Sequence, residues 1–171
     1  MTREDERDWQ GYSLAAEGRI AQINVSRGGV PKLPIAEGMV TTLGIEGDYH
    51  RDQRHHGGIN GALCIYTLEQ IAALQAEGHP IAPGSTGENI TLAGIAQALL
   101  APGARLALGD EVEAEVVSYT TPCVNITDSF SDGDFTRISQ KLHAGESRVY
   151  ARVLRVGRIA TGDTVRVYTV E

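Results

Sequence analysis

The chain has 171 residues, of which 22% are charged and 42% are hydrophobic, and its formal net charge at pH 7 is -7. This length suits a single domain that buries its core without disulfides or metals. An isoelectric point near 5.2, with no run of basic residues, excludes nonspecific nucleic-acid binding, which requires clustered Lys and Arg.

The cysteines and the first residues indicate where the protein works. Cys64 and Cys123 are too few for a disulfide framework and fit a reducing compartment. The charged N-terminus lacks the apolar segment of a secretory signal, and no apolar run is long enough to cross a membrane. We expect a cytoplasmic protein with no membrane partner, with a mobile leader at residues 1–17 and one domain at residues 18–171.

The first expected elements are strands at residues 19–26 and 39–45, which alternate or cluster apolar residues. The loop between them contains Gly28, Gly29 and Lys32, and such a loop can hold a phosphate with its backbone N–H groups. It lacks the full P-loop pattern, so a plain turn is the alternative.

Residues 47–61 form the stretch with the most chemistry. They include three of the five histidines, two arginines and four glycines, around the sequence His55-His56-Gly57-Gly58. Glycine lets the backbone approach a ligand, and imidazole and guanidinium groups bind metals and anions. We expect this loop to face a small polar ligand; the alternative is a solvated loop with an incidental pair of histidines.

A helix is expected directly after a short apolar strand at residues 62–66. Thr67-Leu68-Glu69-Gln70 has the spacing of a capping box, and Leu68, Ile71, Ala72 and Gln75 share one face. Gly78 and Pro80 end the helix.

A turn follows at Gly84-Ser85-Thr86-Gly87-Glu88-Asn89 and leads into a strand at residues 90–92. Its Glu and Asn side chains can offer directed hydrogen bonds to a heterocycle, although they also suit an ordinary turn.

The pattern R-x-A-x-G-D-x-V occurs twice, at residues 105–112 and 158–165. A Gly-Asp pair between strands indicates a tight turn, so each copy predicts a hairpin-like corner of one closed sheet.

The strand after the first copy alternates glutamates with apolar residues and runs into Thr121-Pro122-Cys123. Pro122 makes a rigid corner that presents the Cys123 thiol to a ligand. A buried, purely packing thiol is the alternative, and it is the reading that suits Cys64 in its apolar strand.

A last helix is expected from Asp134 to Gly145, with Phe135, Ile138 and Leu142 on one face, followed by strands at residues 149–156 and 164–170. Many short strands with frequent glycine turns predict a mainly β fold with peripheral helices: a closed or partly closed β-barrel. The His and Gly loop, the Gly-Glu-Asn turn and the Cys123 corner would then meet at one mouth.

The chain resembles the MOSC family, named for the C-terminal domain of molybdenum-cofactor sulfurases, and specifically its small stand-alone bacterial members. The matching segments run in family order over nearly the whole chain: Gly44-Ile45-Glu46-Gly47-Asp48, His55-His56-Gly57-Gly58, Gly84-Ser85-Thr86-Gly87-Glu88-Asn89-Ile90-Thr91, Pro122-Cys123 and Val149-Tyr150-Ala151-Arg152-Val153-Leu154.

The resemblance implies a MOSC-like barrel, a molybdenum cofactor of the molybdopterin type, and a Cys123 thiolate that binds molybdenum or carries sulfur. A soft thiolate suits this metal. The other residues assigned to the cofactor are His56, Gly57 and Gly58 at one wall, Asn89 at the pterin edge, Arg152 or Lys32 at the phosphate, and Thr121.

Two points about the cations remain open. Close relatives often carry an arginine shortly before the Pro-Cys pair, where this chain has Thr120 and Thr121, so another cation such as Arg54 or Arg148 must substitute. Arg152 faces either the mouth or a carboxylate on the barrel wall.

The leading function is a molybdenum-dependent oxidoreductase that reduces small N-hydroxylated compounds, with electrons from a separate donor protein because no Rossmann fingerprint or CxxC cluster is present. The alternative is a carrier of cofactor or sulfur that uses a Cys123 persulfide. A third reading is a zinc site formed by His50, His55 or His56 with Cys123.

Overall fold

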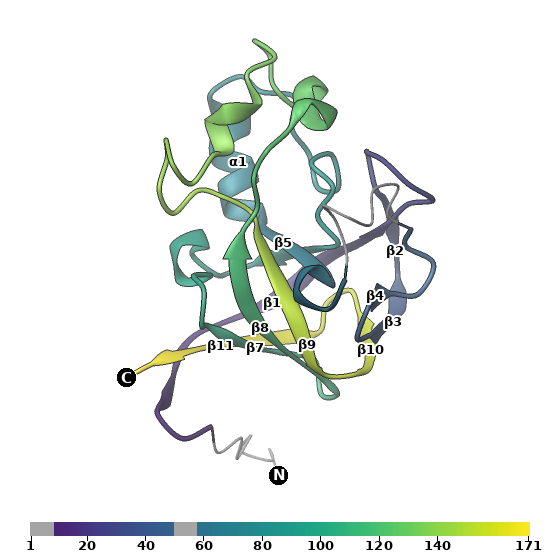
Figure 1. The fold of residues 1–171 in the computed structure, drawn as a ribbon, viewed down its shortest axis with the longest axis vertical. Coiled ribbons are helices and arrows are strands. Elements are labelled where there is room, and N and C mark those ends of the chain that lie inside the picture. The colour runs from purple at the N-terminus through teal and green to yellow at the C-terminus, as the bar shows by residue number, and fades with distance from the viewer. Residues whose placement is uncertain (1–8, 50–57) are drawn as a thin grey trace.

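The computed structural model describes residues 9–49 and 58–171, and its main element is a β-sheet that closes on itself (Figure 1). The strands of this sheet are β1 (Tyr12–Val25), β2 (Leu33–Ile35), β5 (Leu63–Thr67), β6 (Ile90–Ala93), β7 (Arg105–Leu108), β8 (Val112–Tyr119), β9 (Val149–Arg155) and β11 (Thr164–Val170).

The order β11-β7-β8-β9-β5-β6-β1 closes into a barrel because β11 also pairs with β1. The pairings are antiparallel except for that of β5 with β6, and β2 extends the sheet from β1. The predicted mainly β fold with a closed barrel is therefore confirmed.

A smaller sheet lies beside the barrel and joins β10 (Gly157–Ala160), β3 (Glu37–Thr41) and β4 (Gly44–Ile45). Strand β10 pairs antiparallel with β3, and β3 with β4. The chain returns from β10 to the barrel strand β11 through a tight turn.

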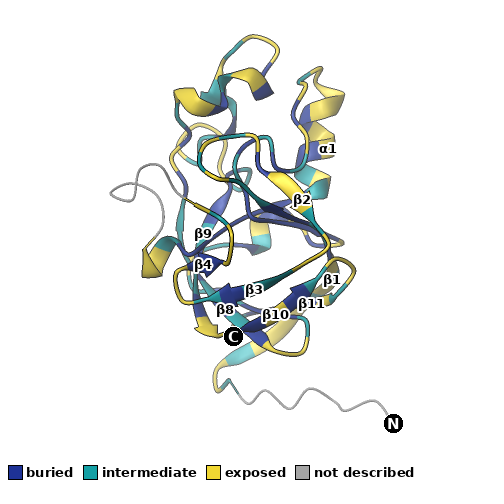
Figure 2. Cartoon of the chain, turned by 90° about the vertical axis from the view of Figure 1, so that its right-hand side faces the viewer, coloured by how far each residue is buried: buried dark blue, intermediate teal, exposed yellow. Residues whose placement is uncertain are grey.

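Strand β8 shows why these sequences form barrel walls. Val112, Ala114 and Val116 are buried, whereas Glu113 and Glu115 face outward, because side chains alternate across a strand. The same alternation places Val149, Ala151 and Val153 of β9 in the core. Figure 2 shows these buried segments along the strands, with exposed residues at the turns.

Strand β1 begins six residues before the expected domain boundary. Tyr12 pairs with Val170 of β11, and the pairing continues to Arg19 opposite Thr164. The prediction of a leader to residue 17 is wrong from Tyr12 onward, because this part of β1 is largely exposed and its polar pattern hides a paired strand. The guanidinium of Arg105 covers the Trp9 and Tyr12 rings at 5.3 and 4.7 Å and helps to fix this segment.

Helix α1 (Leu68–Ala76) follows β5 as predicted. The Thr67 side chain accepts a hydrogen bond from the Gln70 amide at 3.3 Å, which is the expected cap. The buried residues are Ile71 and Leu74, whereas the predicted Ala72 and Gln75 are exposed.

A second apolar cluster joins α1 to the segment between β8 and β9. This segment contains the 3₁₀ helices η3 (Val124–Ser129) and η4 (Phe135–Ile138). The cluster comprises Tyr66, Ile71, Leu74, Ile81, Ile126, Phe130 and Ile138. Two further 3₁₀ helices of the described residues, η1 (Ile59–Gly61) and η2 (Gln97–Leu99), lie within other loops.

The helix expected from Asp134 to Gly145 is only the single turn η4. Asp134 does cap it, accepting a hydrogen bond from the Thr136 amide at 3.0 Å, but the chain becomes extended at Ser139. Leu142 is 62% exposed, so the apolar spacing that predicted a longer helix finds no surface to pack against.

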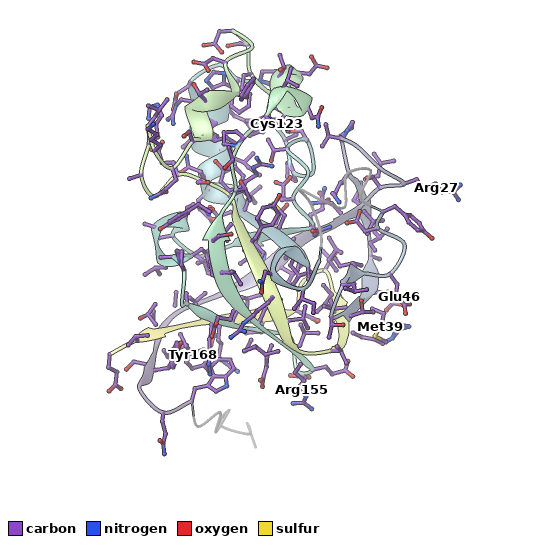
Figure 3. The ribbon with its side chains drawn as sticks, viewed as in Figure 1. Arg27, Met39, Glu46, Cys123, Arg155 and Tyr168 are labelled. Atoms are coloured by element: carbon purple, nitrogen blue, oxygen red, sulfur yellow. The ribbon has the colours of Figure 1, made fainter. Side chains whose placement is uncertain are left out.

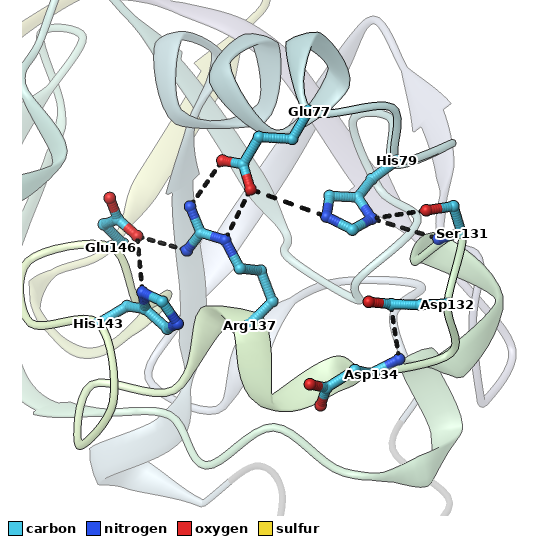
Figure 4. Close-up of polar contacts among 8 residues, drawn as sticks. All are labelled: Glu77, His79, Ser131, Asp132, Asp134, Arg137, His143 and Glu146. Carbon is cyan, nitrogen blue, oxygen red and sulfur yellow. Dashed lines mark hydrogen bonds and ion pairs between the residues drawn. The ribbon is translucent and has the colours of Figure 1, made fainter.

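Polar contacts hold this segment against the end of α1 (Figure 4). Arg137 donates two hydrogen bonds to the Glu77 carboxylate, at 2.9 and 2.7 Å, and a third to Glu146. His79 Nδ1 accepts from the Ser131 amide at 3.2 Å. The residues that follow Cys123 are therefore attached to the helix by both apolar and charged contacts.

The two Gly-Asp turns lie side by side. Gly109 donates its amide to the Thr164 carbonyl at 2.9 Å, and a Cβ at Gly109 would lie 2.7 Å from Asp163 Oδ2. The first turn is the predicted hairpin between β7 and β8. The second is not a hairpin of the same sheet, because it joins β10 of the small sheet to β11.

Candidate functional site

A cavity of about 340 Å³ is lined in part by Cys123, which Figure 3 labels in the upper part of the molecule. Six separate segments of the chain supply its walls. The lining residues are Gly28, Gly29, Val30, Lys32, Tyr49, Cys64, Thr86, Gly87, Asn89, Thr121, Cys123, Asn125, Ile126, Arg148 and Tyr150.

Cys123 lies in this wall, half-buried, at the start of η3. Its backbone is extended, with φ -139° and ψ 174°, and its carbonyl accepts from the Ile126 amide at 3.2 Å. Thr121 lines the cavity two residues earlier. Both residues of the predicted Pro-Cys corner that line the cavity, Thr121 and Cys123, flank Pro122.

Cys64 also lines the cavity, which its apolar strand did not indicate. It is only 6% exposed, and its amide donates to Asn89 Oδ1 at 3.0 Å. Burial raises the pKa of the Cys64 thiol to about 11. The interpretation of Cys64 as a packing residue is therefore incomplete, because its thiol is buried and yet reaches the cavity.

Lys32 and Asn89 both line the cavity, and both bind the carboxylate of Asp48. Lys32 Nζ lies 2.6 and 2.7 Å from the two Asp48 carboxylate oxygens, and Asn89 Nδ2 donates to Oδ2 at 2.6 Å. The Asp48 side chain is 1% exposed. Much of the charge of Lys32 is therefore compensated, and the Asn89 amide group already has partners inside the protein.

Arg148 is the cation in the cavity wall whose hydrogen-bond donors are least satisfied by the described residues. It is 7% exposed, and its Nη1 donates to the Thr86 carbonyl. Its Nε has no hydrogen-bond partner within the described part of the chain. A buried guanidinium with a free donor is expected to bind an anion. Arg148 is one of the two cations that the sequence offered as substitutes for the absent arginine; the other, Arg54, lies outside the described residues.

Glu88 supports the turn that contributes Thr86, Gly87 and Asn89. Its Oε1 accepts from the Gly84 amide at 2.9 Å and from Thr86 Oγ1 at 3.3 Å, while its Oε2 has no partner among the described residues. Burial raises the pKa of this carboxyl to about 7.

The glycine loops pack closely against one another. Lys32 donates its amide to the Gly84 carbonyl at 2.9 Å, and a Cβ at Gly84 would lie 2.3 Å from the Lys32 carbonyl oxygen. Gly28 and Gly29 adopt positive φ angles of 121° and 80°. The loop that the sequence offered as a phosphate cradle or a plain turn is therefore part of the cavity wall.

Tyr150 is a lining residue that sequence reasoning did not single out. In the sheet, Tyr150 is opposite Cys64 of β5 on one side and opposite Ser118 of β8 on the other, so its ring lies near Cys64. The pKa of its hydroxyl is raised to about 12, mainly by burial and also by negative charge on Cys64 and Cys123. No signal in the sequence indicates this position, because the approach of Tyr150 to the cavity depends on which strands are neighbours in the barrel.

Two assigned residues lie away from the cavity, and two more lie outside the described residues. Arg152 lies on the barrel wall, where Nη2 donates to Glu115 Oε1 at 2.8 Å, so its assignment to a phosphate is wrong. Gly58 has a φ of 71° and is not a lining residue. His56 and Gly57 lie outside the described residues.

The zinc reading depends on His50, His55 and His56, which are also outside the described residues. Among residues 9–49 and 58–171, no three His, Cys, Asp or Glu side chains are grouped to hold a metal ion. The Gly-Glu-Asn turn and the Cys123 corner do meet at one mouth, and Tyr49, which precedes the His and Gly loop, joins them. Over the same ranges, no helix is long and apolar enough to span a membrane.

This barrel and its cysteine-lined cavity agree with the comparison to protein families. The MOSC domain model matches residues 52–166, and the chain therefore belongs to the MOSC domain family, which is associated with the molybdenum cofactor.

Among individual relatives, YflK of Bacillus subtilis (strain 168), an uncharacterized protein, is 29% identical over 136 residues. The match covers 78% of this chain, and the chain spans about 60% of the length of that relative.

Solved structures share the fold. The YUAD protein from Bacillus subtilis superimposes with a TM-score of 0.75 at 15% identity, covering 93% of this chain and all of that chain. YiiM from Geobacillus stearothermophilus gives a TM-score of 0.65 at 24% identity, covering 88% and 74%. At these identities the likeness concerns the fold alone.

Proposed function

We propose that the cavity binds a pterin-based molybdenum cofactor and that Cys123 is its molybdenum ligand. The observation that carries this proposal is a half-buried thiol and a buried arginine with a free donor in the wall of one cavity. The association of the MOSC family with this cofactor supports it. Soft thiolates suit soft metals, and guanidinium groups suit phosphates.

The described residues fit such a group. Arg148, whose Nε has no partner among the described residues, would hold the phosphate, and the backbone N–H of Gly29 would add a donor. Lys32 would contribute less, because Asp48 already neutralises it. The pterin would lie between these loops and Cys123.

We further propose that the protein reduces N-hydroxylated compounds, R–NHOH + 2 electrons + 2 protons giving R–NH₂ + H₂O. The bound cofactor would supply the two-electron, oxygen-removing chemistry, and a separate donor protein would supply the electrons. The Tyr150 hydroxyl remains protonated at neutral pH and can donate a hydrogen bond to the substrate oxygen.

The test is turnover of an N-hydroxylated purine base by protein purified from a host that makes the cofactor, with reduced methyl viologen as electron donor. The amine should form in the wild type and not in Cys123→Ser. Arg152→Gln, on the barrel wall, is the matched control and should retain the rate. Equal turnover by Cys123→Ser would overturn the assignment.

A second function, a sulfur carrier that uses a Cys123 persulfide, is favoured by the accessible position of the thiol in a cavity lined by Arg148. Mass spectrometry of the isolated protein distinguishes the two. A persulfide on Cys123, with no reductase activity in cofactor-loaded protein, would favour the carrier.

A further inference from the structure

Both cysteines of the chain are free, and both line the same cavity. They reach it from different parts of the fold, Cys64 from the middle of β5 and Cys123 from the segment after β8. The proposed cofactor chemistry uses only Cys123, so the presence of a second thiol in the same wall calls for a separate explanation.

The strand pairing brings the two thiols to a common neighbour. Cys64 is directly opposite Tyr150, and Ser118 is opposite Tyr150 on the other side. The chain continues from Ser118 to Thr120, which donates its amide to the Arg148 carbonyl at 3.0 Å, and then to Cys123. Negative charge on either thiol acts on the Tyr150 hydroxyl, which is consistent with both sulfurs lying close to it.

The two cysteines differ in how they are held. Cys64 is fixed in a paired strand and bonded through its amide to Asn89. Cys123 lies outside the strands and helices, in residues 120–123, and its carbonyl accepts from the Ile126 amide. Arg148, whose Nε is buried without a partner among the described residues, lines the same cavity as the two cysteines.

We propose that Cys64 is the resolving cysteine of Cys123, so that peroxide converts the pair into a reversible intramolecular disulfide. In the first step the Cys123 thiolate attacks hydrogen peroxide, which breaks the O–O bond and gives the sulfenic acid and hydroxide. In the second step the Cys64 sulfur attacks the sulfenic sulfur, an S–S bond forms, and water leaves. The net change is two thiols and one peroxide to one disulfide and two waters.

This reaction requires no cofactor, so it is independent of the proposed molybdenum function. Formation of the disulfide consumes both free thiols of the cavity wall. Without Cys64, a sulfenic acid at Cys123 would be open to further, irreversible oxidation.

The experiment treats the full chain, reduced and freed of small thiols, with one equivalent of hydrogen peroxide and analyses it by intact-mass and non-reducing peptide mass spectrometry. We expect the free thiols to fall from two per chain to none, with the Cys64 and Cys123 peptides crosslinked and released by dithiothreitol. In Cys64→Ala, one equivalent should instead leave Cys123 as the sulfenic acid, and a second equivalent should convert it to the sulfinic acid.

Two results would overturn the proposal. One is sulfinic acid at Cys123 of the wild type with no crosslinked peptide. The other is a disulfide between two chains through Cys123. Since both are read on the wild type, the test stands even if Cys64→Ala fails to fold.

Discussion

At the scale of single residues, two buried charged groups stand out: Arg148 in the cavity wall and Glu88 in the turn that supports it. Each keeps one polar atom without a partner in the described part of the chain. Burying such atoms costs free energy, and a ligand or a proton can recover part of it. They are therefore the residues at which binding and pH are expected to act.

Replacing Arg148 by Met should weaken retention of the pterin about tenfold to hundredfold, because a hydrogen bond to a charged group contributes roughly 1.5–3 kcal/mol. The measurement is the pterin remaining after graded dialysis, followed by fluorescence. Arg152→Met removes an arginine from the barrel wall and should leave retention unchanged. Equal losses in both variants would contradict the placement of the phosphate at Arg148.

The second residue-scale prediction concerns pH. The folded-state pKa of Glu88 is about 7, against an ordinary value of 4.5. Between these two pH values the folded protein therefore binds more protons than the unfolded chain. The free energy of unfolding contributed by this group should therefore fall as pH rises from 4.5 to 7, by roughly 3 kcal/mol in total.

Urea unfolding at several pH values checks this prediction, with Glu88→Gln as the comparison. The variant keeps an oxygen to accept from Gly84 but cannot ionise, so its stability should vary less over this interval. An unchanged pH dependence in Glu88→Gln would show that other groups are responsible.

At the scale of elements, the loops that form the cavity hold their shape through close backbone contacts. The turn at residues 84–89 and the loop at residues 28–32 touch where Gly84 meets Lys32. The shape of the cavity thus depends on a position at which no side chain fits.

Gly84→Ala should destabilise the protein more than Gly78→Ala. Both glycines have positive φ, 85° and 98°, which costs about 1–2 kcal/mol for alanine. Only at Gly84 does the added Cβ meet backbone, 2.3 Å from the Lys32 carbonyl, whereas nothing lies within 4 Å at Gly78. Chemical denaturation gives both values, and equal destabilisation would mean that the two loops separate at little cost.

Elements with strong local signals could be predicted from the sequence. The Thr67 cap predicted α1, and the alternation of apolar and acidic residues from Val112 to Val116 predicted β8. The start of β1 could not be predicted, because it depends on pairing with the distant strand β11. The shortness of η4 could not be predicted either, because it depends on the absence of a surface against which Leu142 could pack.

At the scale of the whole molecule, barrel closure brings the 28–32 loop, the 84–89 turn and the Cys123 corner together. The sequence predicted this convergence for the turn and the corner, and it predicted Cys123, Asn89, Thr121 and Lys32 as site residues, all of which line the cavity. Cys64 and Tyr150 could not be foreseen, because their approach depends on which strands are neighbours in the barrel.

The most direct test of the account is the molybdenum and pterin content of protein purified from a host competent in cofactor synthesis, measured for the wild type, Cys123→Ala and Arg152→Gln. We predict molybdenum and pterin near one per chain in the wild type and in Arg152→Gln, with molybdenum lost from Cys123→Ala. Wild-type protein that carries neither, although the host makes the cofactor, would contradict the account and leave the sulfur carrier as the function to pursue.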